Sequence, residues 1–98
     1  MFSLSEAKAK IEGYLRKLKV RPPVELIILD QDIIVFKYGW AFFYQSKEFV
    51  ENGDISKALG GNGAIIINKF DGTIHQTGTA YPPEKYIAEY IDSVEKGS

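Results

Sequence analysis

The stretch from residue 64 to residue 79, AIIINKFDGTIHQTGT, carries the clearest structural pattern in the chain. Its run of β-branched residues predicts a strand at 64–70. Lys69-Phe70-Asp71-Gly72 has the form of a type I turn followed by a glycine in the left-handed region, a common way to close a β-hairpin. The residues after this turn predict the partner strand at 73–79, so the stretch is expected to be an antiparallel hairpin.

Two further strands are expected before this hairpin, at 24–30 and 33–44. The first is rich in β-branched residues, and Asp30-Gln31-Asp32 is a plausible turn or bulge after it. Gly39 offers a bend within the second. Whether 33–36 is a strand of its own or part of one long bulged strand stays open at this stage.

A helix is expected at each end of the chain. Ser3 and Glu6 have the spacing of a capping box, and apolar residues recur at three- and four-residue steps as far as Lys19. Gly13 weakens this first helix, so we expect a close approach to a strand there. Arg21-Pro22-Pro23 should end it, and Tyr81-Pro82-Pro83-Glu84 should open the last helix.

The segment from residue 46 to residue 63 lacks a strand pattern. Asp54 is expected to cap a short helical turn through Leu59, with Gly60 as its left-handed stop. The glycines at 60, 61 and 63 precede a strand, whereas phosphate-binding loops open a helix. A loop of low steric demand is therefore the better interpretation than a nucleotide site.

These elements predict the fold class α+β for a single domain covering residues 1–98. The expected architecture is an N-terminal helix packed on one face of a four-stranded, mainly antiparallel meander sheet, with the C-terminal helix nearby. Hairpin-linked consecutive strands are the reason for preferring an antiparallel sheet.

The composition excludes several classes of function. The chain has 98 residues, a net charge of −1 and no cysteine. Disulfides, thiolate metal sites and cysteine nucleophiles are therefore excluded. The balanced charge argues against a nucleic-acid partner and against a membrane partner. The first residues lack a signal-peptide pattern, so a cytoplasmic location is expected.

Candidate catalytic residues are few. His75 is the only histidine, and its strand position places it on the core face or on the solvent face, depending on the turn register. A hydrolase built on His75 with Asp71 or Glu84 is the enzymatic alternative that we keep. Asp30 and Asp32 fall short of a calcium loop and are better explained as turn formers. We expect no catalytic, cofactor or metal site.

Aromatic residues are the more informative set. Trp40 and Tyr44 lie on one face of the strand at 38–44, together with Phe42. If the helices cover one face of the sheet, the other face and its loops remain for recognition. We therefore expect Trp40, Tyr44, Phe70 and His75 to bind a partner, with the segment 47–63 as a further contact. Alternatively Trp40 belongs to the core, and its burial decides the matter.

The chain also resembles a known family, the YrhB-like or immunity protein 35 family. The resemblance rests on the order and spacing of common motifs across nearly the whole chain rather than on one specific element. Matching positions are Ala7, Ala9, Tyr14, Leu15, Gly39-Trp40, Phe42-Phe43-Tyr44, Glu48-Phe49, Gly53-Asp54, Gly61-Asn62, Ile65-Ile66-Ile67, Asp71-Gly72, Gly78-Thr79-Ala80, Pro83, Tyr86-Ile87 and Tyr90. Tyr81-Pro82-Pro83 departs from the simpler helix start of the family.

The resemblance implies a role in bacterial polymorphic-toxin systems. An immunity protein binds a cognate protein toxin and neutralises it by stoichiometric occlusion, without catalysis. The alternative is a small stand-alone chaperone-like or scaffold protein, and family members also occur alone. The resemblance supplies no binding face, and the oligomeric state, a monomer or a weak homodimer, is left open.

Overall fold

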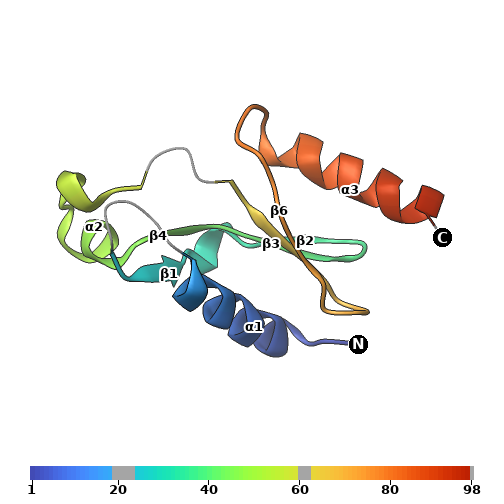
Figure 1. The fold of residues 1–98 in the computed structure, drawn as a ribbon, viewed down its shortest axis with the longest axis horizontal. Coiled ribbons are helices and arrows are strands. Elements are labelled where there is room, and N and C mark those ends of the chain that lie inside the picture. The colour runs from blue at the N-terminus through green and yellow to red at the C-terminus, as the bar shows by residue number, and fades with distance from the viewer. Residues whose placement is uncertain (19–23, 60–62, 98) are drawn as a thin grey trace.

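The computed structural model describes residues 1–18, 24–59 and 63–97 and shows an α+β fold (Figure 1). Its elements in chain order are α1 Leu4–Lys17, β1 Leu26–Ile28, the 3-10 helix η1 Asp30–Asp32, β2 Ile34–Phe36, β3 Gly39–Phe42, β4 Tyr44–Ser46, α2 Lys47–Asn52, the 3-10 helix η2 Ile55–Lys57, β5 Ile65–Asn68, β6 Ile74–Gln76 and α3 Pro83–Gly97. The predicted fold class is confirmed. The predicted stop signals at 21–23 and Gly60 lie outside the described residues.

The start of α1 follows the predicted capping box. The Ser3 hydroxyl accepts a hydrogen bond from the Glu6 amide at 3.1 Å, and the Glu6 carboxylate accepts one from the Ser3 amide at 2.9 Å. Two amides of the first turn that have no partner within a helix are thereby satisfied. These two bonds also hold the pKa of Glu6 below its usual value.

The main sheet has four antiparallel strands in the order β2-β3-β5-β6. Of the two alternatives left open for 33–44, the structure shows a separate strand at 34–36: Phe36 pairs with Gly39, and a tight turn at Lys37 and Tyr38 joins β2 to β3. The strand predicted at 24–30 lies outside this sheet, because β1 pairs with β4 in a separate two-stranded sheet. The main sheet is therefore a four-stranded antiparallel sheet as predicted, but its first strand is β2 and not the segment 24–30.

A bulge at η1 explains why there are two sheets. Ile28 pairs with Tyr44, and Ile34 pairs with Ala41. Between these two pairs the segment from Ile28 to Ile34 advances six residues, while the segment paired with it advances three. The 3-10 turn Asp30–Asp32 accommodates the three extra residues. An insertion of this kind interrupts the ladder and bends the strand. The predicted turn or bulge at these residues is confirmed.

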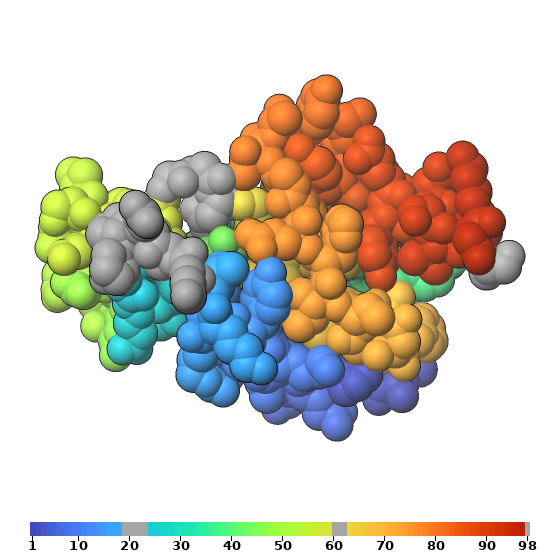
Figure 2. Space-filling model, in the orientation of Figure 1, coloured from blue at the N-terminus to red at the C-terminus, as the bar shows by residue number. Residues whose placement is uncertain are grey.

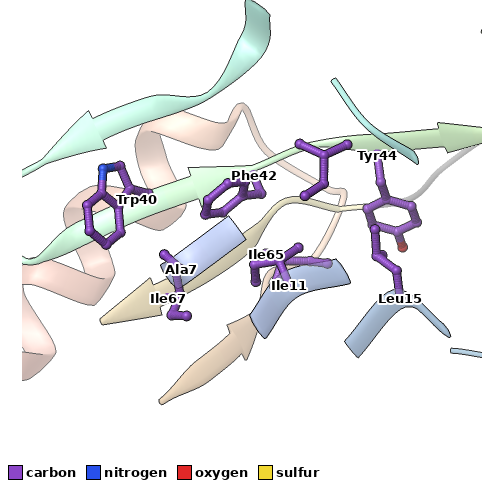
Figure 3. Packing of buried hydrophobic residues seen from close by; sticks show 9 residues of the cluster. Ala7, Ile11, Leu15, Trp40, Phe42, Tyr44, Ile65 and Ile67 are labelled. Atoms are coloured by element: carbon purple, nitrogen blue, oxygen red, sulfur yellow. The ribbon is translucent and has the colours of Figure 1, made fainter. Parts of the chain in front are cut away.

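The helices α1 and α3 lie on opposite faces of the main sheet (Figure 1). On the first face Ala7, Ile11 and Leu15 of α1 pack against Trp40, Phe42, Ile65 and Ile67 (Figure 3). On the second face Ile87 of α3 packs against Ala41, Ala64 and Ile66. The expectation that the helices leave one sheet face free is therefore wrong. All residues of β3 and β5 are buried, so each central strand needs cover on both sides.

The turn between β5 and β6 has the predicted form. Gly72 has a φ of 73°, in the left-handed region, and its amide donates to the Asn68 carbonyl at 2.8 Å. The Asp71 carboxylate accepts from the Thr73 amide at 2.9 Å and from its hydroxyl at 2.7 Å. These two bonds lower the pKa of Asp71.

Two glycines of the fold differ sharply in the space around them. A Cβ at Gly39 would lie 1.9 Å from the backbone oxygen of Ile67, so β3 approaches β5 there as only glycine allows. Among the described residues, a Cβ at Gly13 would meet only the Arg16 side chain, at an ordinary 3.6 Å. The expected close approach of a strand to Gly13 is therefore wrong.

We predict opposite outcomes for alanine at these two positions. Gly13→Ala should raise the free energy of unfolding by about 0.5–1 kcal/mol, because alanine favours the helix and the site has room. Gly39→Ala should lower it by about 3 kcal/mol or more, because the new methyl group meets backbone. Urea denaturation followed by circular dichroism measures both. A neutral Gly39→Ala would contradict the close approach of β3 to β5.

Candidate partner-binding surface

Trp40 and Tyr44 belong to the core under α1. Their rings lie on one face of the β3–β4 segment with Phe42, as the alternation predicted, but only 8% of Trp40 and 4% of Tyr44 is exposed (Figure 3). The Tyr44 hydroxyl accepts a hydrogen bond from the Gln76 side chain at 3.3 Å, and burial raises the pKa of Tyr44. We therefore leave both rings out of the candidate surface, while docking through Phe70 and His75 stays a prediction.

Trp40→Ala should accordingly behave as a core mutation. Removing a buried indole leaves a cavity, and we expect the free energy of unfolding to fall by about 3–5 kcal/mol. Phe70→Ala is the matched aromatic truncation at the surface, with an expected loss of about 1 kcal/mol or less. Thermal and urea denaturation of the two variants test this. Equal losses would mean that Trp40 is not a core residue.

Phe70 is the most clearly presented aromatic side chain of the predicted set. It lies in the β5–β6 turn with 54% of its surface exposed. Its amide donates to the Asn68 side-chain oxygen at 2.8 Å, and its ring contacts the Tyr38 ring edge-on with centroids 6.4 Å apart. The Lys69 ammonium lies over the ring, 5.4 Å from its centre. Phe70 is thus exposed, while its backbone is bonded to Asn68 and its ring contacts Tyr38 and Lys69.

His75 is exposed on the α3 face of β6. Its ring lies against Tyr90 of α3, with centroids 5.9 Å apart. The Tyr90 hydroxyl accepts a hydrogen bond from Asn68 at 3.1 Å, and the oxygen of the same Asn68 amide accepts from the Phe70 amide. One asparagine therefore connects the surroundings of the two exposed residues that the sequence predicted. We name the residues around it the tip surface: Lys37, Tyr38, Lys69, Phe70, His75 and Tyr90.

The tip surface also includes contacts that the sequence analysis did not anticipate. Lys37 and Tyr38, in the β2–β3 turn, both donate to one oxygen of Glu95 near the end of α3, at 2.6 and 2.9 Å. These bonds fasten the last turns of α3 to the hairpin. Both chain ends and both hairpin turns lie at this end of the molecule (Figure 1), and the β5–β6 turn touches the N-terminal segment (Figure 2), where the Phe2 amide donates to the Lys69 carbonyl.

The attachment of α3 should depend on pH. The hydrogen bond from Lys37, then that from Tyr38, holds the pKa of Glu95 below its usual value, and the same pairing raises the pKa of Lys37. A lowered glutamate pKa stabilises the folded state above the unfolded-state pKa and loses this contribution as the pH falls through the folded-state pKa. The raised lysine pKa stabilises the folded state below the unfolded-state pKa, and this contribution is lost as the pH rises through the folded-state pKa of Lys37.

We expect the protection of amide hydrogens at the end of α3, taken relative to the intrinsic exchange rate at the same pH, to be greatest between these two limits and smaller at acidic and alkaline pH. The Glu95 carboxyl carbon, followed by NMR against pH, should titrate below an ordinary glutamate. Lys37→Met should move that titration back towards the usual value. A Glu95 titration that Lys37→Met leaves unchanged would show that the pair does not form in solution.

Among the described residues, no carboxylate contact of His75 is seen that would serve the hydrolase alternative. Asp71 is engaged by Thr73, and among the described residues His75 has only its ring contact with Tyr90. The residues that the structure describes contain no group of three or more acidic or histidine side chains that could hold a metal ion.

The segment after β4 is more regular than the sequence predicted. It forms the unpredicted helix α2, capped by the Ser46 side chain, and then η2, capped by Asp54 as expected. The Gln45 side chain holds it through the amide and carbonyl of Leu59, at 2.6 and 3.0 Å. Ile55 is 80% exposed and is the alternative anchor for a partner on this side.

Fold and surface describe a small α+β protein with the exposed Phe70 ring at the turn between β5 and β6. The family model described as Immunity protein 35 matches residues 5–89, so the chain belongs to the immunity protein 35 family. It is also similar to an uncharacterized protein of Escherichia coli K12 called YrhB, at 37% identity over 90 residues. That match covers 92% of this chain and 89% of YrhB. No solved structure matches, and none of the helices in the described residues is long and apolar enough to span a membrane.

Proposed function

We propose that this protein is a non-enzymatic immunity protein that binds a cognate protein toxin in the bacterial cytoplasm and neutralises it by stoichiometric occlusion. Membership of the immunity protein 35 family supports a role of this kind in general. The observation that supports the tip surface as the binding site is Phe70, an exposed ring whose backbone amide donates to Asn68 and whose ring contacts Tyr38.

An exposed aromatic ring that neighbouring residues contact is suited to binding a protein partner. Interface anchors are commonly aromatic, and an anchor that is already ordered loses little conformational entropy on binding. Phe70 has neighbours that restrict it and a face that stays open. Occlusion needs contact area and shape complementarity, and it needs no reactive group.

The first test is neutralisation. A toxin gene should neighbour the gene for this protein, and coexpression of the two should restore growth to cells that the toxin domain alone arrests. Calorimetry of the purified pair should give one immunity protein per toxin. A weak interaction with several unrelated unfolded proteins, and none with this toxin, would favour the chaperone-like alternative and contradict the proposal.

The second test locates the surface. Phe70→Ala should weaken the toxin complex about 10–100-fold without unfolding the protein, as expected for an anchor residue. Ile55→Ala is the control, since it removes an exposed apolar side chain from the α2–η2 segment, 80% exposed against 54% for Phe70. If Ile55→Ala weakens the complex and Phe70→Ala does not, the surface lies on that segment and the tip surface is wrong.

His75→Ala separates binding from catalysis. An enzyme that used His75 would lose all turnover, and neutralisation by catalytic amounts of protein would disappear. A binder keeps its stoichiometry and loses only part of its affinity. We expect the second result, with titration of the toxin still ending at one equivalent of the variant.

A further inference from the structure

A groove of 330 Å³ lies where α3 begins, away from the tip surface. Its walls include four half-buried apolar residues, Leu29, Ile34, Phe43 and Pro83. Two acidic residues, Asp32 and Glu84, line it, one from η1 and one from the first turn of α3. The groove therefore combines an apolar lining with two carboxylates from separate elements.

The groove stays open because α3 starts too late to cover it. The buried residue of α3 is Ile87, one turn inside the helix, and it packs over Ala41, Ala64 and Ile66. Phe43 follows β3 at the break between the two sheets and is only partly covered by the same cluster. A second hollow of 230 Å³ adjoins the groove across Phe43 and Pro83, which line both.

The two carboxylates are unpaired within the part of the chain that the structure describes. Neither Asp32 nor Glu84 forms an ion pair or side-chain hydrogen bond with any residue that the structure describes. By contrast Asp30, two residues before Asp32, pairs with Lys8 at 2.7 Å. The first turn of a helix favours a carboxylate, which explains Glu84 alone. It does not explain Asp32 in η1.

We propose that this groove binds an arginine side chain presented by the protein partner. The aliphatic stem of arginine packs on apolar surface while its charged end stays at a polar rim, and this groove offers both. The planar guanidinium has several donors and pairs with carboxylates, so it can serve Asp32 and Glu84 together. The Phe43 ring adds a surface on which a guanidinium or its stem can lie.

The size of the groove supports a single side chain as its occupant. Pockets for whole small molecules run from roughly 300 to 1,000 Å³, so 330 Å³ is at the small end. A groove of 550 Å³ between α1 and β1 is larger, but cations and carboxylates both line it, and its Asp30 is already paired with Lys8. Among the described residues that line it, the groove beside α3 differs in having carboxylates as its only charged side chains.

The test uses the isolated protein and two blocked tripeptides that differ only in charge. Acetyl-Leu-Arg-Leu-amide should shift the amide NMR signals of Leu29, Phe43 and Lys85 in a saturable way. Acetyl-Leu-citrulline-Leu-amide keeps the shape and lacks the charge. Its affinity should be at least about tenfold lower, as the loss of a charge-assisted bond implies. Added salt should weaken only the arginine peptide.

Matched variants assign the effect to the two carboxylates. Asp32→Asn with Glu84→Gln should reduce the affinity for the arginine peptide to that of the citrulline peptide. Glu12→Gln with Glu51→Gln makes the same change in net charge at exposed residues of α1 and α2 and should leave the affinity unchanged. Equal binding of the two peptides, or unchanged affinity of the Asp32→Asn, Glu84→Gln protein, would overturn the proposal.

The inference rests on the proposed function in taking a protein toxin as the partner, yet the two fail separately. A toxin that binds the Asp32→Asn, Glu84→Gln protein as tightly as the wild type would overturn the groove as a toxin contact and leave neutralisation intact. A toxin that the wild type does not neutralise would overturn the proposed function. The peptide titration decides the chemistry of the groove in either case.

Discussion

The pairing of β3 with β5 through the middle of the protein is the contact on which the rest of the structure depends. Every residue of both strands is buried, and Gly39 lets the two backbones approach where any side chain would collide with Ile67. Two strands without a solvent face require a helix on each side, and α1 and α3 fill these places. The central strands β3 and β5 therefore offer no free face to a partner. Recognition is therefore left to the ends of the sheet, where the turns and helix termini lie.

The local structure could be predicted from the sequence because short-range chemistry determines it. The Ser3–Glu6 capping box, the Asp71-Gly72 turn and the bulge at 30–32 each depend on residues that are near one another in the chain. The placement of the helices on two faces was missed. Ile65-Ile66-Ile67 is a continuous apolar run, which is typical of a strand buried on both sides, and that signal was available. The separate pairing of β1 with β4 depends on a three-residue register shift that no local pattern shows.

The residues of the candidate site also differ in whether the sequence alone could identify them. Phe70 could be found from the sequence because a ring in a tight turn has little to pack under. Trp40 could not be assigned, since an aromatic side chain on a strand serves equally as a core residue or an anchor, and only its cover by α1 distinguishes them. The Tyr38–Glu95 bond joins residues 57 positions apart. The groove beside α3 likewise combines η1, the end of β3 and the start of α3, and becomes visible only in three dimensions.

The tip surface and the groove lie at opposite ends of α3, which is about 22 Å long for its 15 residues. Ile34 and Phe36, on one face of β2, pack against the α3-side cluster between them. The two ends differ in charge, because Lys69 lies over Phe70 at the tip while Asp32 and Glu84 line the groove. A partner that met both ends would need an arginine at the groove and an apolar pocket at the tip, in a fixed order along α3. Charge complementarity of this kind contributes more to orientation and specificity than to affinity. Selectivity for one toxin therefore does not require contact with the buried sheet, whose residues are occupied by folding.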